Sequence, residues 1–216
     1  MTSNYRQNKK RNGKKPTRKK EQQAVVLDYL SRGYVKSDMS KFGGKPIAQA
    51  IGTEQFTLLE LIPKHGVDLE IGDTVYIGAN RKEKTKIHRV LGLLDFEKLT
   101  ATSRIELDYS IRDIVTSNEE KYVNFFNTTG AISTRLHTLE LIPGIGKKYM
   151  WDIINAREEK PFESFADITE RLPTLTDPAG MIVNRVKQEL DKNTVKRGKS
   201  KYYIFTQVPR RPKNQK

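Results

Sequence analysis

The chain has 216 residues, of which 36% are hydrophobic, with no cysteine and a formal net charge of +14. This length allows one large domain or two small ones. Without cysteine there is no disulfide framework, thiolate zinc site or iron–sulfur cluster, and the three scattered histidines predict no metal site. No apolar run approaches the ~20 residues that cross a bilayer, and the N-terminus is basic and polar, so we expect a cytoplasmic protein.

The positive charge lies at the two ends of the sequence. Residues 1–20 and 192–216 each hold nine Lys or Arg and no acid, which leaves 22 basic against 26 acidic residues in between. Flexible basic arms neutralise phosphates and release counterions. We therefore expect residues 1–23 and 192–216 to be disordered basic tails that contact nucleic acid. A solubilising role is the second interpretation, and an anionic membrane surface is the third.

Residues 24–99 carry short apolar runs broken by Gly, Pro and charged turns, which predicts a small all-β barrel of the oligonucleotide/oligosaccharide-binding (OB) type. The run at residues 56–62 is predicted to be a strand, with the turn at residues 63–66 ending it. The pentapeptide LELIP at residues 59–63 overlaps the end of this run, and it returns at residues 139–143. Residues 73–77 and 86–91 are expected to pair as a hairpin.

The connection between those two strands is basic. It holds Arg81, Lys82 and Lys84 with one acid, and Lys86 and Arg89 follow on the next strand. In an OB barrel, loops and strand faces of this kind contact single-stranded nucleic acid. We predict a phosphate contact at these five residues, and the alternative is a solvated hairpin tip.

From residue 100 the apolar spacing changes to the helical period. Residues 102–115 and 119–126 are predicted helices within a connector at residues 100–130. Residues 131–191 are predicted to form an all-α domain, which includes helices at residues 132–141 and 147–157. The fold class expected is therefore α+β, a barrel followed by a helical domain.

The second LELIP continues into a glycine-rich turn between two predicted helices. Alternating glycines leave the backbone bare, so that N–H groups at the start of the next helix can bind an anion, and two lysines add positive charge. This is the helix-hairpin-helix pattern, which holds a phosphate without reading bases. The residues predicted to bind are Pro143, Gly144, Ile145, Gly146, Lys147 and Lys148.

A degenerate copy of the turn follows thirty residues later. Residues 172–177 align with residues 142–147, with Thr174 and Thr176 in place of the glycines and Asp177 in place of the first lysine. We expect this second repeat to pack against the first and to have a structural role. Residues 201–206 are aromatic, and we predict a docked strand there rather than a surface for stacking bases.

Two long stretches resemble one known family. FTLLELIPKHGVDLEIGDTVYIG and TTGAISTRLHTLELIPGIGKKYMWDIINAREEKPFESFADITERL, with the late Tyr-rich segment, are similar to the archaeal family labelled domain of unknown function 655. The resemblance covers residues 24–206. It implies predicted RNA-binding proteins with an OB-like barrel joined to a double helix-hairpin-helix domain, encoded near translation genes. Ribosomal RNA or the ribosome is the partner that this implies.

Three functions fit these patterns. The first is a non-enzymatic RNA-binding protein. The second is a DNA-repair enzyme, since some DNA glycosylases share the hairpin and place a catalytic lysine where Lys148 stands, but the aspartate segment and cysteine cluster they need are absent. The third is a DNA-binding or protein-interaction scaffold. We find no Ser/His/Asp set, Walker loop or metal-spaced carboxylates, so we expect no enzyme activity and no cofactor.

Overall fold

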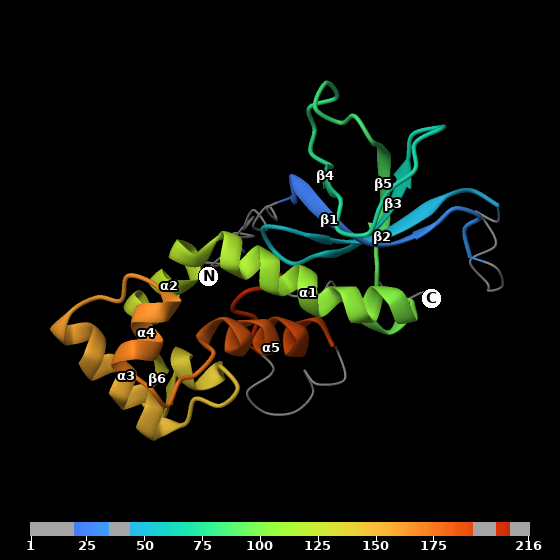
Figure 1. The fold of residues 1–216 in the computed structure, drawn as a ribbon. Helices are drawn as coiled ribbons and strands as arrows, with labels where there is room; N and C mark the ends of the chain where they lie inside the picture. Colours follow the sequence, from blue (N-terminus) through green and yellow to red (C-terminus); the bar gives the residue numbers. More distant parts are fainter. Residues whose placement is uncertain (1–19, 35–43, 192–201, 208–216) are drawn as a thin grey trace, which may run out of the picture.

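A computed structural model describes residues 20–34, 44–191 and 202–207, and most of the tails predicted at residues 1–23 and 192–216 lies outside these ranges. The fold is α+β, as expected: a curled antiparallel sheet forms a half-barrel above a group of helices (Figure 1). The strand order is β4-β1-β2-β3-β5. The strands are β1 (Gln23–Leu30), β2 (Ile47–Gly52), β3 (Leu58–Pro63), β4 (Thr74–Tyr76) and β5 (Ile87–Leu93).

The first LELIP lies in β3, which confirms the predicted strand, but the predicted hairpin between residues 73–77 and 86–91 is wrong. β4 pairs with β1, and β5 pairs with β3, so they occupy opposite edges of the sheet. Curling brings the edges together at one point, where Lys86 Nζ lies 2.8 Å from Asp73 Oδ2. The connection is therefore a crossing between two edges rather than a tight turn.

The predicted helices at residues 102–115 and 119–126 are confirmed as α1 (Ala101–Ser117) and α2 (Glu119–Thr128). The side chain of Thr100 caps α1 by accepting the Ser103 N–H. The remaining helices are α3 (Lys147–Glu159), α4 (Phe165–Arg171) and α5 (Pro178–Leu190), with short 3-10 helices η2 (Phe96–Lys98) and η3 (Thr138–Leu141). No described helix is long and apolar enough to cross a membrane.

The helix α1 is more central than a connector. It packs against β1 and β2 on one side and against α5 on the other, between the sheet and the remaining helices (Figure 1). One apolar cluster runs from Leu27, Ile51 and Leu58 of the sheet through Leu107 and Ile111 of α1 to the other helices. A second cluster fills the inside of the half-barrel. The β and α parts therefore share a core.

Ordered structure begins before the expected boundary at residue 24. The Glu21 carboxylate accepts hydrogen bonds from the backbone N–H groups of Glu54, Gln55 and Thr57, in the turn between β2 and β3. The same turn holds Phe56 at a φ of +53° with its ring fully buried. A non-glycine residue in the left-handed region is strained. The hydrogen bonds to Glu21 help to hold the turn in this conformation.

The predicted helix at residues 132–141 is wrong. A small two-stranded ribbon, β6 (Ala131–Ser133) and β7 (Leu136–His137), is followed directly by η3. The apolar spacing of Ile132, Leu136 and Leu139 imitates a helix, but Ile132, Thr134 and Thr138 have branched side chains that disfavour a helix. The second LELIP therefore ends a 3-10 helix, not an α-helix.

The described part of the C-terminal segment, residues 202–207, forms no strand, so the predicted docked strand is wrong. The expectation that its aromatic residues pack is confirmed for Phe205. Its ring lies 5.7 Å from that of Tyr122 and 5.0 Å from that of Phe125, measured between centroids. This segment therefore covers α2.

Candidate nucleic-acid interface

The glycine loop, residues 142–146, joins η3 to α3. Ile142 and Ile145 are buried in the helical core, and the Ile145 N–H donates to the Ile142 carbonyl oxygen at 3.1 Å. Gly144 has a φ of +88°, the left-handed conformation that glycine adopts without steric cost. Ile145 thus points into the core, and its burial fixes the loop against the helices.

Gly146 is the N-cap of α3 and has a different role from Gly144. Its φ of −89° and ψ of −178° are extended values that any residue can adopt. A Cβ atom at this position would meet nothing within 4 Å. The glycine therefore leaves open space in front of the helix rather than relieving strain.

The start of α3 has no protein acceptor. Gly146 contributes no side-chain cap, and among the described residues the N–H groups of Gly146, Lys147 and Lys148 donate no hydrogen bond. The first N–H groups of any helix lack an intrahelical partner and carry the positive end of the helix dipole. Three exposed donors consequently face the open space beside Gly146.

Two cations reinforce this positive end. Lys147 and Lys148 are exposed, the first turn contains no acid, and neither lysine makes an ion pair with a described residue. Lysines at a helix N-terminus are unfavourable because they repel the dipole. An anion bound here would relieve that repulsion.

The threonine loop, residues 172–177, has a related backbone but a closed helix start. The Leu175 N–H donates to the Leu172 carbonyl oxygen at 2.8 Å, and Leu175 is buried, as Ile145 is in the glycine loop. Asp177 is the N-cap of α5, and its carboxylate accepts the Gly180 N–H at 2.8 Å. The chain thus supplies its own anion at the start of α5.

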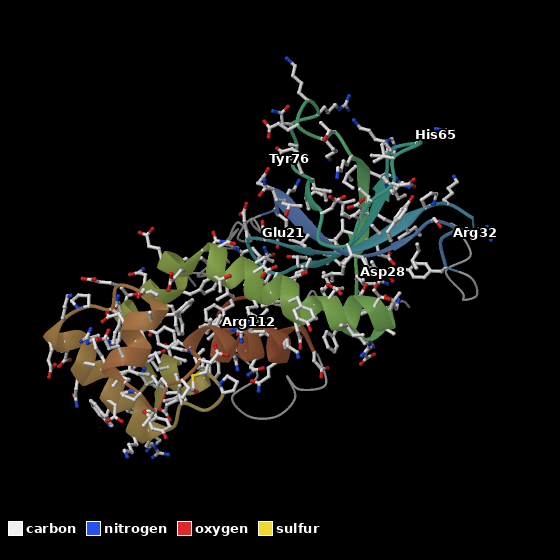
Figure 2. All side chains as sticks on the ribbon, in the orientation of Figure 1. Glu21, Asp28, Arg32, His65, Tyr76 and Arg112 are labelled. Carbon is white, nitrogen blue, oxygen red and sulfur yellow. The ribbon has the colours of Figure 1, made fainter. Side chains whose placement is uncertain are left out.

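That carboxylate is further neutralised by Arg112 of α1, which points from α1 toward the helices (Figure 2). Two guanidinium nitrogens of Arg112 donate to Asp177, at 2.6 and 3.2 Å. The bond with Arg112 lowers the pKa of Asp177 below its usual value, which keeps the carboxyl charged. A phosphate at the start of α5 would have to displace this ion pair.

The glycine loop is held on its η3 side by a capping box. The Nδ1 atom of His137 accepts the Leu139 N–H at 3.1 Å, and the Glu140 carboxylate accepts the His137 N–H at 3.0 Å. Burial lowers the pKa of His137, and Arg157 lowers it further, so that Nδ1 stays available as an acceptor near neutral pH. The cap fixes the start of η3, the element that leads into the glycine loop.

A buried ion pair in α5 also holds the end of η3, just before the glycine loop. Arg185 is 1% exposed and Glu189 is 2% exposed, and the Arg185 Nε donates to Glu189 at 2.8 Å. The guanidinium also donates to the carbonyl oxygens of Leu141, just before the glycine loop, and of Tyr202. The sequence analysis missed this pair, although Arg and Glu four residues apart in an apolar stretch were a visible signal.

Glu189 completes the connection to the C-terminal segment. Its carboxylate accepts the N–H groups of Ile204, Phe205 and Thr206, at 2.9, 3.1 and 2.8 Å. One charged pair therefore joins η3, α5 and residues 202–206, and we call it the buried hub.

Of the five basic residues predicted on the half-barrel, Lys86 is paired with an acid of the protein. Arg81 and Lys82 are exposed in the β4–β5 connection, Lys84 there is half-buried, and Arg89 is exposed on β5. Lys86 is engaged in the ion pair with Asp73, whose pKa its Nζ lowers. Figure 1 places this connection on the far side of the sheet from α3. The two predicted contact regions are therefore separate.

One residue beside the glycine loop was missed by the sequence analysis. Trp151 of α3 is 57% exposed, although the rest of the apolar stripe of this helix is buried or half-buried. It follows Lys148 by three residues, so the two share a helix face.

Among the described residues no group of three or more His, Asp or Glu side chains can hold a metal ion.

The chain is similar over most of its length to archaeal proteins. A family model described as "Protein of unknown function (DUF655)" matches residues 20–207. The "Uncharacterized protein MJ0038" of Methanocaldococcus jannaschii is 45% identical over 193 residues, which are 89% of this chain and 82% of that protein. The crystal structure of Af1531 from Archaeoglobus fulgidus, a DUF655 protein, superposes with a TM-score of 0.76 at 38% identity, covering 87% of this chain and 100% of that one. The chain is thus a member of the DUF655 family.

Proposed function

We propose that the protein is a non-catalytic RNA-binding protein that holds a backbone phosphate at the start of α3. In this proposal η3, the glycine loop and α3 are one helix-hairpin-helix unit, and α4, the threonine loop and α5 are the second. The phosphate oxygens accept the free N–H groups of Gly146 and Lys147, and the two lysine side chains add mobile positive charge.

The observation that carries the proposal is the contrast between the two helix starts. The start of α5 is satisfied by Asp177 and Arg112, whereas among the described residues no acceptor pairs with the first N–H groups of α3 and no acid with its two lysines. Because two lysines at a helix N-terminus repel the positive end of the helix dipole, an uncapped, positively charged helix start at one of the two loops favours a ligand-binding role there.

The half-barrel has a secondary role in this proposal, as an OB-like domain. One face of its sheet is covered by α1 and the other is filled by its own apolar cluster. Its contacts with RNA therefore come from the β4–β5 connection, through Arg81, Lys82 and Lys84, and from Arg89. The basic tails extend the contact along RNA outside this surface.

DNA is the alternative ligand, because a phosphate clamp does not touch the 2′-hydroxyl that distinguishes RNA. RNA is preferred on the resemblance to predicted RNA-binding proteins, and a ribosomal or ribosome-associated RNA is the specific partner proposed. Competition between single-stranded RNA and duplex DNA of equal length, at one salt concentration, separates the two ligands. Preference for the duplex would favour the DNA alternative.

The test of the clamp is charge reversal at Lys147 and Lys148. The double variant K147E/K148E should bind a fluorescein-labelled single-stranded oligoribonucleotide roughly 10-fold or more weakly, since charge-assisted bonds to phosphate contribute about 1.5–3 kcal/mol. The control K64E/K98E changes the net charge equally at exposed lysines of the half-barrel. Equal loss in both double variants would show that only overall charge matters, and would contradict the clamp.

A further inference from the structure

Trp151 is an exposed aromatic residue on a helix face that is otherwise polar. The residues exposed along this face of α3 are Lys148, Trp151, Asn155 and Glu158, and the buried face is formed by Met150 and Ile153. An indole is among the most expensive side chains to leave in water, because it presents a large apolar area. Its place outside the core is not explained by packing.

The indole makes no recorded polar or ring contact within the described residues. No aromatic ring stacks on it, and its Nε1 atom donates no hydrogen bond to them. A tryptophan that packed on a neighbouring surface would lose most of its exposure, yet Trp151 retains 57%. A planar apolar surface is therefore available to a ligand.

The position of Trp151 relates it to the glycine loop. Side chains of a helix lean toward its N-terminus, so the indole covers the surface over the preceding turn, which contains Lys147 and Lys148. The Cα atom of Trp151 lies about 7 Å along the helix axis from that of Gly146, at 1.5 Å per residue. A nucleotide whose phosphate sits at the start of α3 has its base within reach of this ring.

We propose that Trp151 stacks on an unpaired base next to the phosphate held by the glycine loop, so that this site takes single-stranded nucleic acid or a flipped-out nucleotide. The inference rests on the proposed function and narrows it, since a phosphate clamp alone accepts duplex and single strand equally. The two flanking lysines favour a polyanion as the occupant of this apolar surface over a neutral protein segment. Stacking on an aromatic ring tolerates any base, because every base has a π-face.

The chain offers a direct probe, since Trp151 is its sole tryptophan. Titration of the protein with a single-stranded oligoribonucleotide should quench its tryptophan emission to a saturable limit. An abasic oligomer of the same length and charge should bind without that quenching. Binding itself is followed separately by the anisotropy of a fluorescein label on each oligomer.

The variant W151A should bind the base-containing oligomer roughly 5- to 100-fold more weakly, the range that one stacked base contributes, and the abasic oligomer as tightly as the unaltered protein does. W151F should retain most of the affinity. Y109A is the matched control, since Tyr109 of α1 is 65% exposed and far from the lysines in sequence, and it should change neither affinity. Thermal melting of each variant verifies that it is folded.

The outcomes separate this inference from the function on which it rests. Suppose that K147E/K148E loses affinity, that W151A binds both oligomers normally, and that the oligomer does not quench the emission of the unaltered protein. The clamp then stands and the stacking is overturned. If no form of the protein shifts the anisotropy of any labelled oligomer, both are overturned. An equal loss of affinity for the two oligomers in W151A would also overturn stacking, because the loss of a contact with a base cannot weaken the binding of an abasic oligomer.

Discussion

Gly144 and Gly146 have different roles. The backbone conformation of the loop requires Gly144, whereas Gly146 leaves room for the proposed ligand. Gly144 adopts a φ of +88° that an L-amino acid with a side chain reaches only at a steric cost. Gly146 is in an extended conformation with open space around its Cα. The sequence showed two equivalent glycines, and only the backbone angles distinguish their roles.

These angles predict different effects on stability. G144A should lower the free energy of unfolding by about 1–2 kcal/mol, the cost of a left-handed alanine. G146S should leave it unchanged or raise it by a few tenths of a kcal/mol, since serine is a better N-cap than glycine. Urea denaturation measures both, and a G146S variant as destabilised as G144A would contradict the distinction.

At the scale of elements, the helix α3 is locally unfavourable at its start. It has two lysines and no acid in its first turn, and no side-chain cap. The helix α5 has the opposite arrangement, with Asp177 as its cap and Arg112 behind it. A single chain thus contains both an open and a closed version of the same turn.

Charge reversal in the first turn of α3 should therefore stabilise the fold while it weakens RNA binding. Each of K147E and K148E should raise the free energy of unfolding by about 0.3–1 kcal/mol at low salt, because a carboxylate is favourable at a helix N-terminus. Denaturation at low and high salt measures the effect, which salt should diminish. Destabilisation by both substitutions would mean that the lysines support the fold.

The sequence predicted the positions of individual helices and strands better than it predicted which strands pair. The apolar periods located β3, α1, α2 and α3, because burial of one face imposes that period. The same reasoning failed at residues 132–141, where Ile132, Leu136 and Leu139 have helical spacing but local strand propensity and the His137 cap prevail. It also paired β4 with β5, since strands adjacent in sequence usually pair, whereas β4 pairs with β1 and β5 with β3, at opposite edges of the sheet.

For the whole molecule, the buried hub is the feature that links distant parts of the chain. Arg185 and Glu189 join the carbonyl end of η3, the helix α5 and residues 202–206. No sequence period reveals such contacts, because each is made by a side chain to a backbone far away in sequence. The hub also holds the carbonyl oxygen of Leu141, just before the glycine loop.

Removing one charge of the hub should be costly. E189Q leaves the Arg185 guanidinium buried without its counter-ion, and breaking a buried pair in this way costs about 3–5 kcal/mol. We expect a large fall in the melting temperature and faster proteolysis near residues 202–207, because glutamine keeps only one of the two oxygens that accept their backbone N–H groups. The control E163Q, at an exposed ion pair with Lys160, should change stability little. Equal melting temperatures for the two variants would contradict the role of the hub.

The central claim is that the open start of α3, and not positive charge in general, binds phosphate. The direct measurement is the affinity of G146D for a single-stranded oligoribonucleotide at fixed salt, compared with G130D. Both glycines have room for a side chain, and both variants carry the same added charge. Aspartate at position 146 should cap α3 as Asp177 caps α5, so G146D should bind roughly 10- to 100-fold more weakly, with G130D close to the unaltered protein. Equal affinities of G146D and G130D would contradict the claim.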